Sequence, residues 1–197
     1  LSETARKMGC VNTLVKEADG WHGYNTDYYG FCALVRKSGI AIAGKKVLVL
    51  GSGGASNTVC RAVEDMNARE VRVISRSGED NYTNLDKHAD AEIIVNTTPV
   101  GMYPNNGKSP VDLALFPKLE GVLDVIYNPA RTAFMLQAEE LGIKNAGGLY
   151  MLTAQAKRSS ELFTAKAVDD KEIDRITDIL SSGMRNIILI GMPGCGK

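Results

Sequence analysis

The sequence predicts an α/β protein built on a doubly wound parallel sheet. Short apolar runs recur along the chain at 45–50, 70–75, 91–96 and 121–127. Segments with a helical period separate these runs, a pattern typical of strands that are buried on both faces and joined by crossover helices. The first run passes directly into a cluster of glycines, as in α/β domains that hold a ligand at the carboxyl ends of their strands.

The glycine cluster lies in residues 45–56, KKVLVLGSGGAS, which join a strand, a tight turn and the start of a helix. Gly51 permits the turn, and Gly53 and Gly54 let the backbone approach a ligand closely. The helix then presents unpaired N–H groups and the positive end of its dipole to the phosphates of a dinucleotide. This order of elements predicts a Rossmann-like domain. A glycine turn that serves packing alone is the alternative.

Composition narrows the classes of function. The 197 residues carry 23 basic and 23 acidic side chains, so no strong field attracts nucleic acid or an anionic membrane. No run is long and apolar enough to span a bilayer, and no signal peptide precedes the first motif. The four cysteines have no metal-ligand spacing. We therefore expect a cytoplasmic protein with reduced thiols, no metal and no nucleic-acid or membrane partner.

The first 43 residues predict part of a small lobe that precedes the dinucleotide domain. Extended runs at 11–16 and 21–24 flank the sequence EADG, which is a hairpin signal. Residues 25–27 then lead into a helix whose apolar face holds Phe31, Leu34, Val35 and Ser38. We expect the domain boundaries to fall at residues 1–43 for this lobe, 44–182 for the dinucleotide domain and 183–197 for a linker and tail.

The end of the second predicted strand indicates which dinucleotide is bound. An acidic residue there would bind the ribose 2′-hydroxyl of NAD, but this chain has Ser75, Arg76 and Ser77. A guanidinium flanked by hydroxyls suits a 2′-phosphate, which favours NADP. Glu79 and Asp80 follow shortly after and keep NAD open. A solvated arginine at a strand end is the alternative without a ligand.

The later part of the chain predicts three more helices. Thr132 is a plausible N-cap for a helix that carries Phe134, Ala138 and Leu141. A helix after Gly147 is expected to bury Leu149, Leu152, Ala156 and Phe163, while Gly148, Met151 and Gln155 line a neighbouring face. In the last helix the expected apolar stripe is Ile173, Ile176, Thr177 and Leu180.

Seven motifs then occur in a fixed order. They are GCVNT at 9–13, GYNTDxxG at 23–30, GSGGAS at 51–56, SRS at 75–77, NTTPVGM at 96–102, DVIYNP at 124–129 and GxxMLxxQA at 148–156. Together they resemble the shikimate 5-dehydrogenases over roughly residues 1–180. The resemblance implies reversible reduction of 3-dehydroshikimate to shikimate by NADPH, in a cleft between two lobes, within aromatic amino-acid biosynthesis.

The resemblance also implies roles for individual residues. Asn12 and Asp27 match residues that bind the substrate hydroxyls, Asp27 being also the partner of a catalytic lysine, and Gln155 and Tyr127 match further residues on the substrate side. The implied cofactor site has Gly51, Ser52, Gly53, Gly54 and Ala55 at the pyrophosphate, Ser75, Arg76, Ser77, Gly78, Glu79 and Asp80 at the 2′-phosphate end, Val125, Gly148 and Met151 around the nicotinamide, and Glu3 near the mouth.

Each substrate-side residue also has a purely structural interpretation. Asp27 could cap the helix that it precedes, Asn12 could belong to a turn, and Gln155 could be solvated. Met151 could fill the core and Tyr127 could be an ordinary strand aromatic. The two histidines, His22 and His88, have no catalytic partner in the sequence and are expected at the surface.

The ends of the chain depart from the family pattern. The family's catalytic lysine and the hydroxyls that grip the substrate carboxylate lie upstream of the GCVNT match, where this chain has only Leu1–Met8. We therefore expect this polypeptide alone to be inactive or nearly so. The tail contains Gly191–Lys197 in the spacing GxxxxGK and resembles the start of shikimate kinase, so a fused dehydrogenase and kinase is a coherent hypothesis. A non-catalytic module that senses nucleotide or shikimate on the same fold is the alternative.

Overall fold

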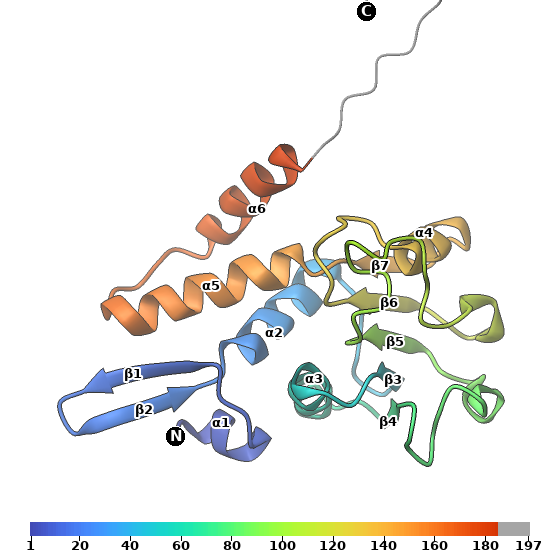
Figure 1. The fold of residues 1–197 in the computed structure, drawn as a ribbon, viewed down its shortest axis with the longest axis horizontal. Helices are drawn as coiled ribbons and strands as arrows, with labels where there is room; N and C mark the ends of the chain where they lie inside the picture. The colour runs from blue at the N-terminus through green and yellow to red at the C-terminus, as the bar shows by residue number, and fades with distance from the viewer. Residues whose placement is uncertain (185–197) are drawn as a thin grey trace, which may run out of the picture.

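The computed structural model describes residues 1–184, and the predicted phosphate loop Gly191–Lys197 lies outside them. Its centre is a five-stranded parallel sheet with helices on both faces (Figure 1). The strands are β3 (Lys46–Leu50), β4 (Glu70–Ile74), β5 (Ile93–Asn96), β6 (Gly121–Asp124) and β7 (Lys144–Ala146). The predicted doubly wound α/β fold is confirmed.

The strand order β4-β3-β5-β6-β7 places the first strand of the domain between the second and the third. The chain therefore leaves β3 in one direction to reach β4 and returns past β3 to form β5. Such a reversal opens a crevice between the carboxyl ends of β3 and β5, where open α/β sheets bind their ligands. The glycine turn after β3 lies at this crevice.

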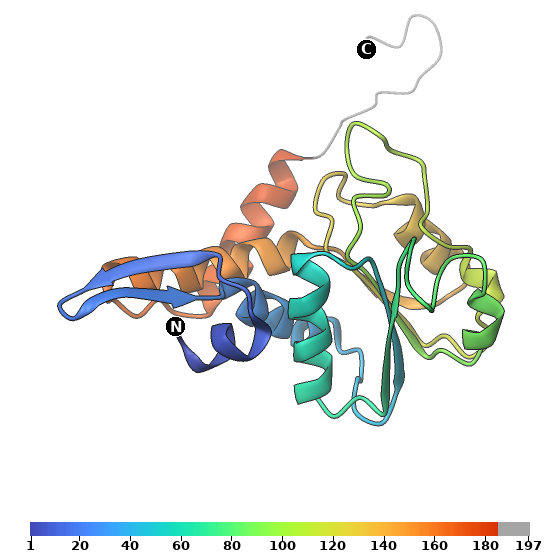
Figure 2. The ribbon, with the colours of Figure 1, turned by 60° about the horizontal axis from the view of Figure 1, so that its bottom comes forward.

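Alternate residues of the strands point into two separate cores, which explains why the strands read as continuous apolar runs. Val47 and Val49 pack with α2 (Thr26–Ser38), α3 (Gly54–Asp65) and Met151 of α5 (Leu149–Thr164). Leu48 and Leu50 point to the opposite face, where they pack with α4 (Ala133–Glu140) and the short turns η1 (Leu85–His88) and η2 (Leu113–Leu115). Figure 2 shows α3 on one side of the strands and α4 on the other.

The N-terminal segment forms a short helix α1 (Glu3–Met8) and an antiparallel hairpin of β1 (Thr13–Glu17) and β2 (Gly20–Tyr24). Helix α2 then begins behind its N-cap Asn25, whose Oδ1 accepts the N–H of Tyr28 at 3.1 Å. Asp27 lies in the first turn of this helix and is not its cap. The carboxylate of Asp27 is thus left available for another role.

Helix α5 corrects one expectation. Phe163 is 62% exposed and Ala156 is also exposed, whereas the buried residues are Met151, Thr153 and Ala154. The reason is that α5 packs along α2, where Gly30 lets the two backbones approach; this contact turns a different face of α5 inward. A Cβ added to Gly30 would lie 2.6 Å from the carbonyl oxygen of Met151.

Helix α6 (Lys171–Gly183) packs less than its pattern predicts. Ile173 is buried, but Ile176 and Leu180 are 37% and 42% exposed. Among the described residues the helix packs mainly against α5 (Figure 1), and Met184 at its end lines a hollow together with Tyr103 and Tyr127. No helix among residues 1–184 combines the length and apolar character needed to cross a membrane.

Candidate active site

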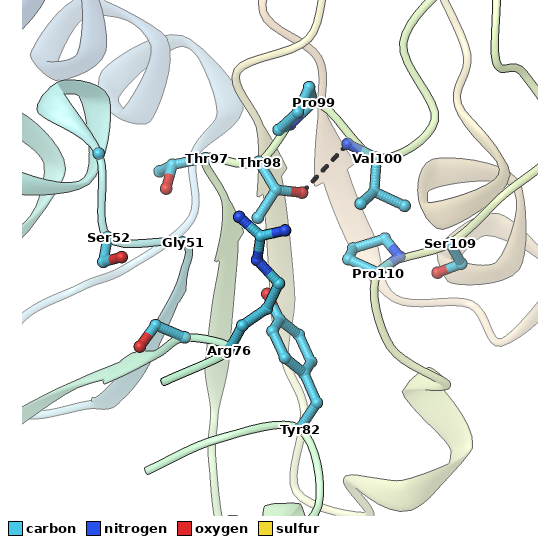
Figure 3. Close-up of a pocket in the computed structure, with 12 residues that line it drawn as sticks. Gly51, Ser52, Arg76, Tyr82, Thr97, Thr98, Pro99, Val100, Ser109 and Pro110 are labelled. Atoms are coloured by element: carbon cyan, nitrogen blue, oxygen red, sulfur yellow. Dashed lines mark hydrogen bonds between the residues drawn. The ribbon is translucent and has the colours of Figure 1, made fainter. Parts of the chain in front are cut away.

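A cavity of about 670 Å³ lies at the carboxyl ends of β3, β4 and β5 (Figure 3). It is lined by the glycine turn, the end of β4 and the segment after β5, namely Gly51, Ser52, Gly53, Ser75, Arg76, Tyr82, Thr97, Thr98, Pro99, Val100, Ser109 and Pro110. The reversal of strand order therefore brings together the turn and the arginine that the sequence predicts to hold a dinucleotide.

The glycine turn is held against the segment after β5. Gly51 has φ +107°, and a Cβ there would lie 2.9 Å from Thr97 Oγ1 and 3.1 Å from Thr98 Cγ2. The Thr97 hydroxyl donates to the carbonyl oxygen of Leu50 at 2.6 Å. Both its backbone conformation and its surroundings thus require glycine at position 51.

The start of α3 suits an anion. Its N-cap Gly53 supplies no side-chain hydrogen bond, and within residues 1–184 the N–H groups of Gly54, Ala55 and Ser56 have no hydrogen-bond partner. A Cβ at Gly53 would meet nothing within 4 Å. Open space therefore lies beside three unpaired donors and the positive end of a helix dipole, which is the arrangement that binds phosphate groups.

Arg76 is exposed and extends into the cavity from the end of β4. In Figure 3 its guanidinium points toward the segment 97–100, and the side chain of Tyr82 lies nearby on the same wall. Ser75 is buried behind it. This guanidinium has no ion-pair partner among residues 1–184, so it can bind a phosphate on the ribose of a nucleotide whose pyrophosphate sits at α3.

The other predicted residues of this loop do not line the cavity. Ser77 and Glu79 are exposed, and Gly78 forms a tight turn in which a Cβ would lie 2.6 Å from Ser75 Oγ. The Asp80 carboxylate lies 2.9 Å from Nε2 of His88, so it is turned away from the cavity. His88 is itself 6% exposed, and the expectation of a surface histidine is therefore wrong.

The end of β6 carries a buried polar network. Asp124 Oδ1 accepts from Asn96 Nδ2 at 3.1 Å and from the N–H of Ile126 at 3.0 Å, while Oδ2 accepts from Thr132 Oγ1 at 2.7 Å. Thr132 also caps α4, as predicted. Burial raises the pKa of Asp124 to about 6, although the three hydrogen bonds act in the opposite direction.

Gly148 joins the end of β6 to the start of α5. Its N–H donates to the carbonyl oxygen of Ile126 at 2.9 Å, and a Cβ at this position would overlap the carbonyl oxygen of Val125. Met151, one turn later, is buried in the core beneath the sheet. The structure therefore brings together Val125, Gly148 and Met151, the three residues predicted around a nicotinamide.

The substrate-side residues come from α2, α5 and the segment before β1. Asn12 Oδ1 accepts from the N–H of Thr26 at 2.9 Å, which ties Asn12 to the first turn of α2 beside Asp27. Burial raises the pKa of Asp27 above its usual value, and the Asn12 side chain partly offsets this. Gln155 packs against α2, since a Cβ at Gly30 would lie 3.1 Å from Gln155 Cβ.

Gln155 has one polar atom that points to a ligand. Its Oε1 is buried and has no hydrogen-bond partner among residues 1–184. An unpaired buried acceptor costs about 1–3 kcal/mol, so a ligand hydroxyl that donated to it would be favoured. The structure therefore places Asp27 and an unsatisfied amide oxygen on two helices that pack together.

Two predicted residues lie apart from these groups. Tyr127 is 46% exposed and lines a second hollow with Tyr103 and Arg131. Glu3 is exposed and forms an ion pair with Lys7, with 2.5 Å between Oε1 and Nζ. Contact with Lys7 also lowers the pKa of Glu3. The roles of Tyr127 and Glu3 stay predictions.

Sequence reasoning missed Tyr82 and Asp124. Tyr82 lies in a polar loop without periodicity, so nothing in the sequence indicates that its ring reaches the cavity wall. Asp124 could have been found, because a carboxylate inside an apolar run must be paired when the strand is buried.

The chain was compared with protein families, curated sequences and solved structures. No family model matches it. The shikimate dehydrogenase (NADP(+)) of a Clostridium perfringens strain is 32% identical over 193 residues, covering 91% of this chain and 71% of that protein. The solved chorismate mutase/shikimate 5-dehydrogenase fusion protein of Clostridium acetobutylicum superposes with a TM-score of 0.88 at 38% identity, covering 93% of this chain and 71% of the other.

A third relative was solved with ligands. The shikimate 5-dehydrogenase of Thermus thermophilus, in complex with NADP(H) and shikimate, has a TM-score of 0.78 at 30% identity, covering 90% of this chain and 71% of the other. The likeness covers at least 90% of this chain in all three cases. The chain belongs to the shikimate dehydrogenase family.

Proposed function

We propose that the chain binds NADP in the cavity and serves an enzyme that reversibly reduces 3-dehydroshikimate to shikimate. The observation that carries this proposal is that one cavity holds both Arg76 and the start of α3, neither of which has a polar partner at its free N–H groups among residues 1–184. Membership of a family whose members include NADP(+)-dependent shikimate dehydrogenases supports it.

The residues present fit the cofactor. The N–H groups of Gly54, Ala55 and Ser56 would hold the pyrophosphate, and Arg76 would hold the 2′-phosphate. NADP, when bound, supplies the site that accepts or donates hydride. Gly148 and Met151 would support the nicotinamide end, where the lack of a side chain at Gly148 keeps α5 close to β6.

On the substrate side the chain supplies groups that orient the substrate and a carboxyl group that can exchange a proton. Gln155 Oε1 would accept a hydroxyl of the substrate, and the Asn12 side chain holds the first turn of α2, which carries Asp27. Because burial raises the pKa of Asp27, its carboxyl is better suited to proton exchange than an exposed carboxylate. We propose that Asp27 orients a substrate hydroxyl and takes part in moving its proton.

Calorimetric titration of the chain with NADP and with NAD tests this function. We expect saturable binding of NADP that is tighter than binding of NAD. Arg76→Ala should weaken NADP by roughly tenfold to a hundredfold, because it removes a charge-assisted contact worth about 1.5–3 kcal/mol. The affinity for NAD should change little in this variant.

The matched control is Lys87→Ala, which removes an exposed positive charge near the same loop. It should leave NADP affinity within about twofold. If the folded chain binds neither nucleotide, the glycine turn is a packing device and the proposal is wrong.

Three finer points stay predictions from the sequence. The fused shikimate kinase rests on the Gly191–Lys197 motif, while the fusion partner of the Clostridium acetobutylicum relative is chorismate mutase. The cytoplasmic location and the domain boundaries at 43 and 182 rest on composition and motif order.

A further inference from the structure

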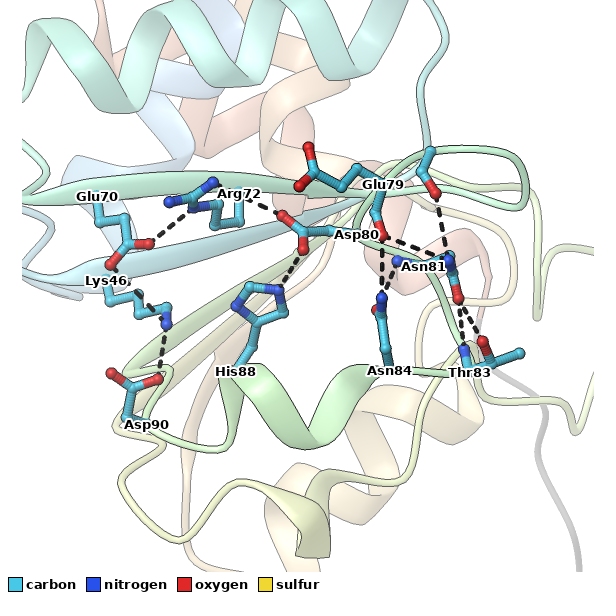
Figure 4. A network of polar contacts seen from close by, with 11 residues as sticks. Lys46, Glu70, Arg72, Glu79, Asp80, Asn81, Thr83, Asn84, His88 and Asp90 are labelled. Carbon is cyan, nitrogen blue, oxygen red and sulfur yellow. Dashed lines mark hydrogen bonds and ion pairs between the residues drawn. The ribbon is translucent and has the colours of Figure 1, made fainter.

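The loop that follows Arg76 is braced by its own hydrogen bonds (Figure 4). Asn81 Nδ2 donates to the carbonyl oxygen of Gly78 at 3.2 Å, and Asn84 Nδ2 donates to that of Glu79 at 2.9 Å. The N–H of Asn81 donates to Asn84 Oδ1 at 2.9 Å. The loop therefore closes on itself within a few residues of the arginine.

Asp80 connects this loop to the sheet at two points. Its carbonyl oxygen accepts the N–H of Ser75 at 3.2 Å, directly before Arg76. Its carboxylate lies with Oδ1 2.9 Å from His88 Nε2 and Oδ2 3.8 Å from Arg72 Nη1. Backbone and side chain of one residue thus hold both ends of the turn that carries the arginine.

The carboxylate of Asp80 and the ring of His88 are in close polar contact. Asp80 Oδ1 lies 2.9 Å from His88 Nε2, although neither ring nitrogen makes a well-directed hydrogen bond with any of residues 1–184. The two groups are nevertheless close partners, because the imidazole is buried and Asp80 is the carboxylate against it. Contact with His88 is also the largest cause of the lowered pKa of Asp80.

The charges around Asp80 continue along the edge of the sheet. Arg72 Nε lies 2.8 Å from Glu70 Oε1, and Lys46 Nζ lies 3.8 Å from Glu70 Oε2 and 2.7 Å from Asp90 Oδ1. Asp80 therefore docks onto a row of alternating charges that lies away from the cavity. Its carboxylate is already engaged there, which leaves it poorly placed to accept ribose hydroxyls.

We propose that Asp80, held by His88, is a positioning residue that fixes the loop 75–84 so that Arg76 is presented to the 2′-phosphate of the nucleotide. Asp80 thereby promotes selection of NADP, although an acidic residue after this strand would ordinarily indicate NAD. This inference rests on the proposed function for the identity of the ligand. It goes beyond the proposed function because it assigns to Asp80 and His88 an effect on the affinity for a ligand that neither residue touches.

The test is calorimetric titration of the folded chain with NADP and NAD, comparing Asp80→Ala and Asp80→Asn with the wild type. Asp80→Ala should lower the affinity for NADP about tenfold and the affinity for NAD less than threefold. The reason is that only the contact with the 2′-phosphate depends on the position of Arg76. Asp80→Asn keeps an acceptor for His88 and should recover part of the lost affinity.

The matched control is Asp86→Asn, which removes the same charge from an exposed residue of the neighbouring turn η1. It should not weaken NADP, so a loss seen only with Asp80 variants cannot be a general change of charge. His88→Gln supplies an independent variant. The double variant Asp80→Ala/His88→Gln should bind NADP no more weakly than Asp80→Ala alone, because the two residues act as one unit.

The outcomes separate this inference from the proposed function. If the wild type binds neither nucleotide, the proposed function fails together with the inference. If the wild type prefers NADP and all Asp80 and His88 variants bind it equally well, only the inference is overturned. It is also overturned if Asp80→Ala weakens NAD and leaves NADP unchanged, since Asp80 would then be a ribose ligand. Should Asp80→Ala not fold, Asp80→Asn and His88→Gln decide between these outcomes.

Discussion

Asp124 is fully buried at the end of β6, and the stability of Asp124→Asn relative to wild type should rise with pH between about pH 4 and pH 6. The substitution keeps the shape of the side chain and an acceptor for Asn96 and Ile126, and the loss of the acceptor for Thr132 Oγ1 is a cost that does not depend on pH. The substitution also removes a charge that burial disfavours, because burial raises the pKa of Asp124 to about 6 from its usual 3.8. The effect should depend on pH in a specific direction.

The sign and size follow from proton linkage. Between pH values near 3.8 and 6 the folded protein holds a proton on Asp124 that the unfolded chain has lost, so stability falls as the pH rises through this window and is then constant. A difference of about 2 pH units corresponds to about 3 kcal/mol in total. Roughly 2 kcal/mol of this falls between pH 4.5 and pH 7.5.

Urea denaturation of wild type and Asp124→Asn at several pH values measures this difference. The stability of the variant relative to wild type should rise by about 2 kcal/mol from pH 4.5 to pH 7.5 and level off above pH 6. Asp112→Asn is the control: the backbone N–H of Ala114 lowers the pKa of this exposed carboxyl, so its effect should be constant in this range. A relative stability of Asp124→Asn that is independent of pH, or that falls as pH rises, would refute the reasoning.

Substitutions of three glycines should separate folding from binding. Gly148→Ala should cost about 2–4 kcal/mol of unfolding free energy, because the new methyl overlaps the Val125 carbonyl oxygen, and urea denaturation checks this. Gly30→Ala should cost about 1–3 kcal/mol, since its methyl would press on the Met151 carbonyl oxygen and push α5 from α2; unchanged stability would mean that the helices separate freely. Gly53→Ala should leave stability within about 0.5 kcal/mol yet weaken NADP at least tenfold in calorimetry, because its methyl meets only open space where the phosphates are expected. Unchanged NADP affinity in this variant would contradict the proposed pyrophosphate site.

The sheet was predictable from the sequence where strands are buried on both faces. The runs at 45–50, 70–75, 91–96 and 121–127 all contain strands, although β6 stops at Asp124, where the side-chain hydrogen bonds replace the ladder. Strand β7 was not predicted, because its three residues Lys-Asn-Ala carry no apolar pattern. Its pairing is determined by the edge of β6 that it covers.

The residues that sequence reasoning misplaced depend on partners that are distant in the chain. The inward face of α5 is chosen by its contact with α2 at Gly30, so the apolar Phe163 stays exposed. His88 is buried because the loop after β4 returns Asp80 to it. Local pattern indicates elements and turns, whereas the orientation of a helix or the burial of one histidine follows from tertiary contacts.

The most direct test of the central claim is an amide-resolved NMR titration of the chain with NADP. The account predicts saturable shifts at the N–H groups of Gly54, Ala55 and Ser56 and around Arg76, with no comparable change in the hairpin β1–β2. NAD at the same concentration should shift the α3 amides but leave the Arg76 region nearly unchanged. Shifts confined to residues outside the cavity, or no shifts in the folded protein, would contradict the assignment of this cavity as the NADP site.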